Sequence, residues 1–323
     1  MERELALELV RVTELAALAA APWMGRGDKN SADGAATEAM RRMFDSITIQ
    51  GTVVIGEGEM DEAPMLYIGE QVGNLQGPAV DVAVDPLEGT EIVAMGLNNA
   101  MSVLAIAPQG QLLHAPDMYM EKLAVGPALA GKLSIRDPIR TTVEKAALAL
   151  SKPLSDLTVI LLDRPRHAEL VRDLRDAGVR IKFLSAGDVA GAMAPAFPET
   201  GIDLYVGSGG APEGVLAAAA LKCLGGEIQG RLMPEDQEQF DRCVAMGITE
   251  PRRVLRMDDM VGTGDVIFTA TGVTPGEFLG GVRYLPDQRA ETHSVVMRVK
   301  TQTIRYIRSL HYLPNKALLR NAN

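Results

Sequence analysis

Two carboxylates at the end of an apolar run have the residue types and spacing for chemistry. Val80, Val82 and Val84 alternate as on one face of a β-strand, and Asp85 and Glu88 follow at its carboxyl end. Ligands bind at the carboxyl ends of strands in α/β sheets, and carboxylate oxygens suit Mg²⁺ or Mn²⁺. The pattern favours a divalent-metal site, although a turn aspartate followed by a first-turn helix glutamate explains the same residues without a metal.

Pro86 and Thr90 define the turn that holds these carboxylates. Pro86 has no backbone N–H for a strand ladder, so the strand is expected to end by Asp85 and to lead into a tight turn or a first helical turn. Thr90 places a hydroxyl just beyond the two carboxylates.

Two further acidic segments repeat this design. The β-branched run 52–55 is followed by alternating glycines and glutamates at 56–59, which include Glu57, and glycine lets a backbone approach a ligand closely. Asp33 lies in the segment 29–34, which is expected to lead into a helix. Three acidic points on three elements are therefore expected to converge.

The residues at 85–90 carry a family resemblance. Asp-Pro-Leu-Glu-Gly-Thr is similar to the Asp-Pro-(Ile/Leu)-Asp-Gly-(Thr/Ser) signature of the lithium-sensitive sugar and inositol phosphatases, with Glu88 where most members have aspartate. Together with the segments 29–34, 56–59 and 207–214, this run makes nearly the whole chain resemble the bacterial class II fructose-1,6-bisphosphatases.

The resemblance implies a mixed α/β protein with the two-domain, layered αβαβα sugar-phosphatase fold. A metal-binding domain is expected over 1–140, completed by C-terminal strands, and a substrate-binding domain with parallel strands over 141–323. The implied reaction is metal-dependent hydrolysis of the 1-phosphate of fructose 1,6-bisphosphate to fructose 6-phosphate and phosphate, a step of gluconeogenesis. The alternatives are a sedoheptulose-1,7-bisphosphatase, an inositol-phosphate phosphatase and a non-catalytic phosphosugar sensor.

The resemblance also implies roles for individual residues. One of two or more divalent cations, Mg²⁺ or Mn²⁺, would be held by Asp33 and Glu57, and another by Asp85, Glu88 and Glu213. The implied catalytic residues are Thr90, which orients the attacking water, with Asp33 and Glu57. The implied substrate-binding residues are Glu88, Gly89, Thr90, Tyr119, Arg164, Pro165, Arg166, Ala186, Gly187, Asp188 and Gly210, with Lys29 as a further phosphate contact or an ordinary loop lysine.

The arginines also suggest a phosphate site from their own chemistry. Arg164 and Arg166 flank the rigid Pro165 just after an apolar run, and guanidinium groups bind phosphate in a bidentate manner. A solvated turn with two surface arginines is the alternative. So acidic a chain, with a net charge of -10, needs cations in any site that binds an anion.

Composition excludes several classes of protein. The chain has 323 residues, of which 47% are hydrophobic, and can bury one large core or two medium ones. The negative charge disfavours nucleic-acid and acidic-membrane partners, and no window reaches about 18 uninterrupted apolar residues. Cys223 and Cys243 have no paired spacing, so we expect free thiols in the cytoplasm. A sugar bisphosphate is the expected partner, and the resemblance adds a homo-oligomer, dimer or tetramer.

The remaining pattern predicts the elements that position these residues. An amphipathic helix is expected near 5–19, and a hairpin from apolar runs at 99–107 and 111–115. From about residue 139, helices alternate with short apolar strands, which favours parallel pairing, and the region 266–307 is β-rich. A segment at 126–133 has P-loop spacing, but Leu133 replaces the hydroxyl residue that would hold Mg²⁺, which argues against an NTPase.

Overall fold

The computed structural model describes residues 1, 4–58 and 65–316, and the chain divides into two compact units. The first unit comprises residues 1–112 and 264–323, and the second comprises residues 113–263. The predicted boundary lies at residue 140, whereas the second unit begins at residue 113. The reason is that β5 (Tyr119–Val125) pairs with a strand of the second unit on each side. The expected mixed α/β class is confirmed.

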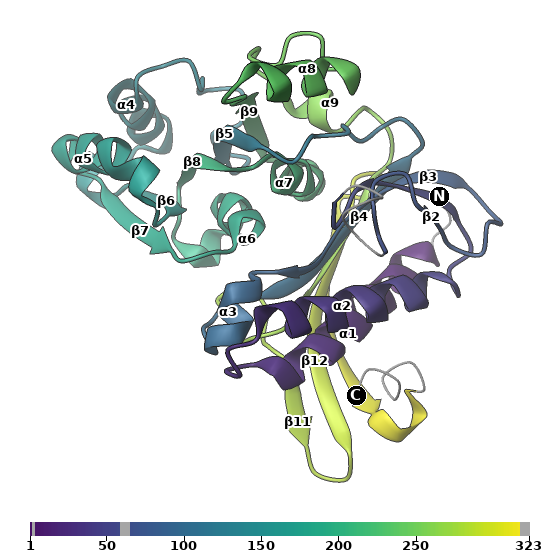
Figure 1. The fold of residues 1–323 in the computed structure, drawn as a ribbon. Coiled ribbons are helices and arrows are strands. Elements are labelled where there is room, and N and C mark those ends of the chain that lie inside the picture. The colour runs from purple at the N-terminus through teal and green to yellow at the C-terminus, as the bar shows by residue number, and fades with distance from the viewer. Residues whose placement is uncertain (2–3, 59–64, 317–323) are drawn as a thin grey trace. The chain divides into compact units, whose positions relative to one another are not determined.

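The first unit is built on one mixed sheet. Its helices are α1 (Leu5–Ala20), α2 (Lys29–Phe44) and α3 (Thr90–Met95), and its strands are β1 (Gln50–Ile55), β2 (Gln71–Val72), β3 (Ala79–Glu88), β4 (Met101–Pro108), β10 (Ile267–Gly272), β11 (Arg283–Leu285), β12 (Arg289–Arg298) and β13 (Thr303–Tyr312). In the described part of the chain these eight strands follow the order β11-β12-β10-β4-β3-β1-β2, with β13 beside β12. Figure 1 shows α1 and α2 lying together along this sheet.

Strands from the end of the chain complete this sheet. β10 pairs antiparallel with β4, and β12 pairs with β10. α1 packs on these strands and carries Thr13, whose hydroxyl lies 2.8 Å from that of Thr271. Thr271 in turn lies 2.8 Å from the Ser294 hydroxyl, so the buried hydroxyls of three elements satisfy one another. The expected first helix is confirmed.

Two local expectations are wrong. β3 does not end at Asp85 but continues to Glu88, because its pairing with β4 shifts register between these two residues. The irregularity accommodates Pro86, whose missing N–H would break a regular ladder. The hairpin after β4 is also absent from the described strands: the backbone N–H groups of Gln111 and Leu112 donate to the buried Asp81 carboxylate, at 2.8 and 2.9 Å, instead of joining β4.

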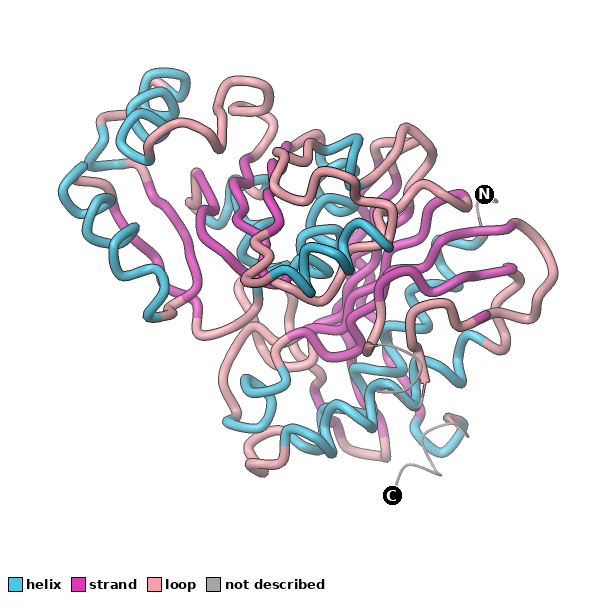
Figure 2. Tube along the Cα trace, turned by 45° about the horizontal axis from the view of Figure 1, so that its top comes forward, coloured by secondary structure: helices cyan, strands magenta, loops and turns pink. Residues whose placement is uncertain are grey.

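The second unit is a five-stranded sheet between helices, as Figure 2 shows. Its strands, besides β5, are β6 (Thr158–Leu162), β7 (Arg180–Leu184), β8 (Leu204–Gly210) and β9 (Glu227–Leu232), and its helices are α4 (Ile139–Leu150), α5 (Ala168–Ala177), α6 (Asp188–Met193), α7 (Ala211–Leu224), α8 (Gln237–Ala245) and α9 (Met257–Met260). The strand order is β7-β6-β8-β5-β9, and β6 pairs in parallel with both β7 and β8. The parallel pairing predicted from the alternation is confirmed.

The two faces of this sheet bury different side chains. Leu123, Leu161 and Val206 belong to an apolar cluster with residues of α4 and α5. Neighbouring positions point the other way, since side chains alternate along a strand. On that face Lys122 and Tyr205 meet the beginning of α6, so one face of the second unit buries polar groups.

Candidate active site

In the first unit, α2 and the end of β1 bring two carboxylates together. Asp28 caps α2 by accepting the Ser31 backbone N–H at 3.0 Å, so the helix begins at Lys29 and Asp33 lies inside it rather than in a lead-in. Glu57 follows β1 and hydrogen-bonds to the Asp33 side chain. Glu59 lies outside the described residues.

The Asp33–Glu57 pair shares a proton in the absence of a cation. Burial, the negative charge of Asp33 and the hydrogen bond with Asp33 together raise the pKa of Glu57 to about 8, and burial has the largest effect. Burial also raises the pKa of Asp33, while its hydrogen bond with Glu57 opposes the rise. Two like charges in contact cannot both be ionised at low cost, so Glu57 keeps the proton.

The turn after β3 carries the second pair of carboxylates. Asp85 Oδ1 accepts the Leu87 backbone N–H at 3.1 Å, and Glu88 is buried with 3% exposure. Gly89 has φ +93°, in the left-handed region that favours glycine, and it occupies the N-cap position of α3. Thr90 is therefore the first residue of α3 and not its cap, which rules out the structural role that would compete with a catalytic one.

Lys29 lies beside α3. Its Nζ is 3.8 Å from Glu91 Oε1, next in sequence to Thr90, and both side chains are exposed. The ion pair places the first residue of α2 next to the first turn of α3 and gives Lys29 a definite neighbour. Its role as a phosphate contact stays a prediction.

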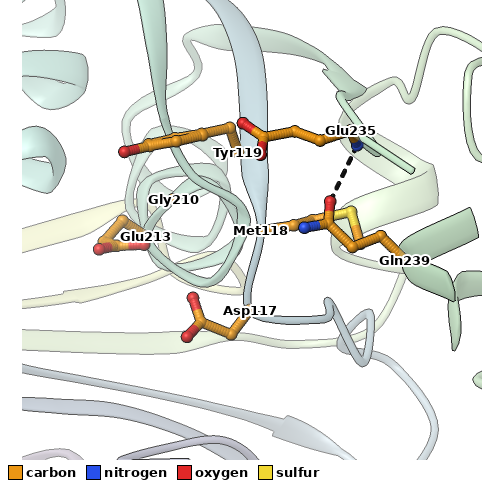
Figure 3. Close-up of a pocket in the computed structure, with 7 residues that line it drawn as sticks. All are labelled: Asp117, Met118, Tyr119, Gly210, Glu213, Glu235 and Gln239. Carbon is orange, nitrogen blue, oxygen red and sulfur yellow. Dashed lines mark hydrogen bonds between the residues drawn. The ribbon is translucent and has the colours of Figure 1, made fainter.

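In the second unit, one pocket is lined by two predicted substrate residues, Tyr119 and Gly210, and by Glu213, a predicted metal ligand. Tyr119, Gly210 and Glu213 line it together with Asp117, Met118, Glu235 and Gln239 (Figure 3). Gly210 precedes α7, and a Cβ atom there would lie 2.0 Å from Glu213 Oε2, so a side chain at this position would displace the carboxylate. The pocket thus has an aromatic ring and several carboxylates on its walls.

Four of these wall residues had not been identified from the sequence. Asp117 and Met118 immediately precede Tyr119, so their place beside it was readable from proximity in the chain. Glu235 and Gln239 flank the start of α8, where the Glu235 backbone N–H donates to Gln239 Oε1 at 2.9 Å. Nothing in their local sequence distinguishes them from ordinary polar residues at a helix start.

A buried ion pair acts on Glu213, one of the pocket residues. Lys122 and Asp188 are almost fully buried, and their side chains form a salt bridge to which the Tyr205 hydroxyl also donates. Burial raises the pKa of Glu213, Lys122 opposes this effect, and the charge of Asp188 reinforces it. Asp188 therefore has two strong protein partners, while its role as a substrate contact stays a prediction. Gly187 is the N-cap of α6 with φ +94°, directly after Ala186.

The two predicted phosphate arginines have different partners. The Arg164 guanidinium donates to the carbonyl of Asp163 at 2.9 Å, while Arg166 donates to Ser208 and lies over the Tyr119 ring, 4.5 Å from its centroid. Pro165 begins the short 3-10 helix Pro165–His167, which includes Arg166 and follows Arg164. Arg166 thus lies against Tyr119, one of the residues that line the pocket, whereas the described hydrogen bond of Arg164 is to the neighbouring backbone.

The donor chemistry of Asp33 and Glu57 fits a divalent cation, because a cation would replace the shared proton and relieve the repulsion. In the stretches 4–58 and 65–316, no group of three or more histidine, cysteine, aspartate or glutamate side chains is close enough to hold a metal ion. The predicted sets of Asp33 with Glu57, and of Asp85 and Glu88 with Glu213, stay predictions.

No helix in the described parts of the chain is long and apolar enough to cross a membrane.

Comparison with known proteins identifies the family. A family model described as bacterial fructose-1,6-bisphosphatase, glpX-encoded, matches residues 3–311. Fructose-1,6-bisphosphatase 1 class 2 of Escherichia coli K12 is 48% identical and the alignment covers 98% of this chain and 97% of that protein. Fructose-1,6-bisphosphatase class 2 of Haemophilus influenzae is 46% identical, with 97% of each chain covered. This chain therefore belongs to the glpX-type family of bacterial fructose-1,6-bisphosphatases.

Proposed function

We propose that this protein hydrolyses the 1-phosphate of fructose 1,6-bisphosphate, releasing fructose 6-phosphate and inorganic phosphate as a step of gluconeogenesis. The observation that carries the proposal is the match of nearly the whole chain to relatives named class 2 fructose-1,6-bisphosphatases. The chain keeps the threonine and both carboxylates of the signature at 85–90, with Glu88 in place of the usual aspartate.

The first unit supplies the groups for the chemical step. Asp33 and Glu57, with Asp85 and Glu88, would hold divalent cations, and Mg²⁺ or Mn²⁺ suits their oxygen ligands. When bound, such cations activate water and stabilise the charge on the leaving oxygen. Thr90, at the start of α3, would accept or donate a hydrogen bond that orients the attacking water toward phosphorus.

The second unit supplies the groups that recognise the sugar phosphate. Arg166 would pair with the non-reacting phosphate, with Tyr119 stacked against its guanidinium group. Gly210 and Glu213 line the same pocket as Tyr119, where the sugar would bind. The predicted contacts of Arg164, Pro165, Ala186, Gly187 and Asp188, and the place of Glu213 in a metal site, belong to this proposal.

A phosphate-release assay tests the reaction and its substrate together. Fructose 1,6-bisphosphate, sedoheptulose 1,7-bisphosphate and an inositol monophosphate are compared with Mg²⁺ and with Mn²⁺. We expect the highest kcat/KM for fructose 1,6-bisphosphate. A higher value for either rival substrate would reassign the enzyme, and binding of the bisphosphate without phosphate release would make the protein a sensor.

Location and assembly extend the proposal. Cys223 and Cys243 are both buried and neither takes part in a disulfide, which supports a location in the reducing cytoplasm. A homodimer or homotetramer is the assembly that we expect, and sedimentation of the purified protein measures it directly.

A further inference from the structure

A buried histidine next to Arg166 has a defined protonation pattern. His167 has 4% exposure, and its Nδ1 lies 2.8 Å from the carbonyl oxygen of Leu162. A carbonyl oxygen only accepts hydrogen bonds, so Nδ1 carries the proton. Nε2 is then the acceptor, and the Ser208 backbone N–H donates to it at 2.8 Å. The imidazole thus connects the end of β6 to β8 in one tautomer.

Ser208 connects His167 to Arg166 by hydrogen bonds. Its Oγ accepts a hydrogen bond from Arg166 Nε at 2.9 Å, and its carbonyl oxygen accepts one from Nη2 at 2.6 Å. The same Oγ lies 3.1 Å from His167 Nε2. Two donors of the guanidinium group are used on one serine, and the remaining N–H groups are left to bind a ligand.

The guanidinium plane is also fixed from its face. The Arg166 Cζ lies 4.5 Å from the centroid of the Tyr119 ring, and Tyr119 lines the pocket with Gly210. Gly207 contributes by its lack of a side chain, since a Cβ atom there would lie 3.1 Å from the His167 ring. Edge contacts through Ser208 and a face contact through Tyr119 together hold a long, flexible side chain in one orientation.

We propose that His167 and Ser208 are positioning residues that preorganise Arg166, and with it Tyr119, for binding the non-reacting phosphate. The inference rests on the proposed function, because it assumes that Arg166 binds a phosphate. An arginine already held in its binding orientation loses less conformational freedom when the ligand arrives, so its contribution appears as affinity. Neither His167 nor Ser208 needs to touch the substrate.

The test is a double-mutant cycle between Ser208 and Arg166, measured as KM and kcat for fructose 1,6-bisphosphate. Ser208→Ala keeps the carbonyl acceptor and loses only Oγ, so we expect KM to rise about tenfold or less with kcat unchanged. In an Arg166→Ala background, the same Ser208→Ala change should leave KM where it is, because there is no guanidinium left to position. A merely structural serine would lower the melting temperature and raise KM equally in both backgrounds, and that result would overturn the proposal.

His167 variants give the second arm. His167→Leu removes the donor and the acceptor and should raise KM with kcat retained, while His167→Gln, which can still accept at the position of Nε2, should recover part of the affinity. Ser208→Ala decides the question if His167→Leu does not fold. Arg180→Ala is the matched control, since that guanidinium also bonds a backbone carbonyl of this unit, at Asp156, and KM should not change.

The outcomes separate this inference from the proposed function. No turnover of fructose 1,6-bisphosphate by the unmodified protein, or no rise in KM with Arg166→Ala, would overturn the assignment of the phosphate site itself. A rise in KM with Arg166→Ala but none with Ser208→Ala and His167→Leu would overturn only the positioning role.

Discussion

The two units treat buried carboxylates in opposite ways. In the first unit Asp33 faces Glu57, another carboxylate, and burial raises the pKa of both. In the second unit Asp188 faces the ammonium group of Lys122 and the hydroxyl of Tyr205. The negative charge of a buried acid with a cationic partner is balanced by the protein itself. Two acids in contact need a bound proton or an added cation to balance their charge.

This difference separates chemistry from recognition. The acid pair of the first unit is suited to binding divalent cations, so its removal should act on turnover. The acid of the second unit already has a cationic partner, and both charges act on the pocket residue Glu213, so changes around it should act on stability and substrate affinity. Four predictions test this division, in order of decreasing effect.

Metal removal should have the largest effect. Exhaustive treatment with EDTA should abolish phosphate release, and Mg²⁺ or Mn²⁺ should restore it, because the candidate residues of the first unit are carboxylates with no catalytic histidine or cysteine proposed among them. The measurement is initial rate against added metal, with zinc and calcium as comparison ions. Full activity in a sample shown by elemental analysis to be metal-free would refute the proposed mechanism.

Breaking the ion pair of the second unit should cost the most stability. Lys122→Met leaves the buried Asp188 carboxylate without its cation, and such a loss typically destabilises a protein by about 3–5 kcal/mol. Denaturant unfolding measures the change. Lys152→Met is the matched control: its ammonium group bonds Asp203 at 2.6 Å but is 41% exposed, so removing it should cost less. Equal losses for the two variants would mean that burial does not decide the cost.

Thr90→Ala should lower kcat about 100-fold with KM nearly constant, since a hydroxyl that aligns the attacking water acts mainly in the transition state. The cap of α3 is Gly89, so the melting temperature should change little. Thr90→Ser keeps the hydroxyl and should retain much of the rate. A Thr90→Ala protein that is destabilised but fully active would contradict the catalytic assignment.

The smallest effect should be a pH dependence of stability in the metal-free protein. The pKa of Glu57 is raised from the model-peptide value of 4.5 to about 8 in the folded state, so the folded state binds this proton more tightly than the unfolded chain does. The resulting stabilisation is present below pH 4.5 and is lost as the pH rises through about 8. Denaturant unfolding at several pH values should show this decline.

Saturating Mg²⁺ should reduce the decline, because a bound cation takes the place of the proton. Glu57→Gln is the control, since an amide does not titrate and the contribution of this pair should disappear. If the variant shows the same decline as the unmodified protein, the titrating group lies elsewhere.

The sequence by itself determined the family and the α/β class, and it named the candidates for the chemistry, whose roles stay predictions. Apolar periodicity identified α1 and the alternating strands and helices of the second half, because these patterns depend on local spacing. The run at 85–90 and the glycine-rich segment before α7 marked the ends of β3 and β8, and the carboxyl ends of strands are where ligands bind in many α/β sheets. Apolar periodicity and the residues at strand ends are both local features, so they can be read without knowing which elements become neighbours in the fold.

Only the tertiary structure decided which of those residues acquire partners. Asp81 diverted the chain at Gln111 from the predicted hairpin, and a register shift let β3 run through Pro86. Lys122 and His167 belong to no motif. Lys122 pairs with the carboxylate of Asp188, 66 residues away in the sequence, and His167 accepts the backbone N–H of Ser208, 41 residues away. Strand order decides which residues meet, and burial makes an unpaired polar group costly. Neither strand order nor burial can be read from the local spacing of residues.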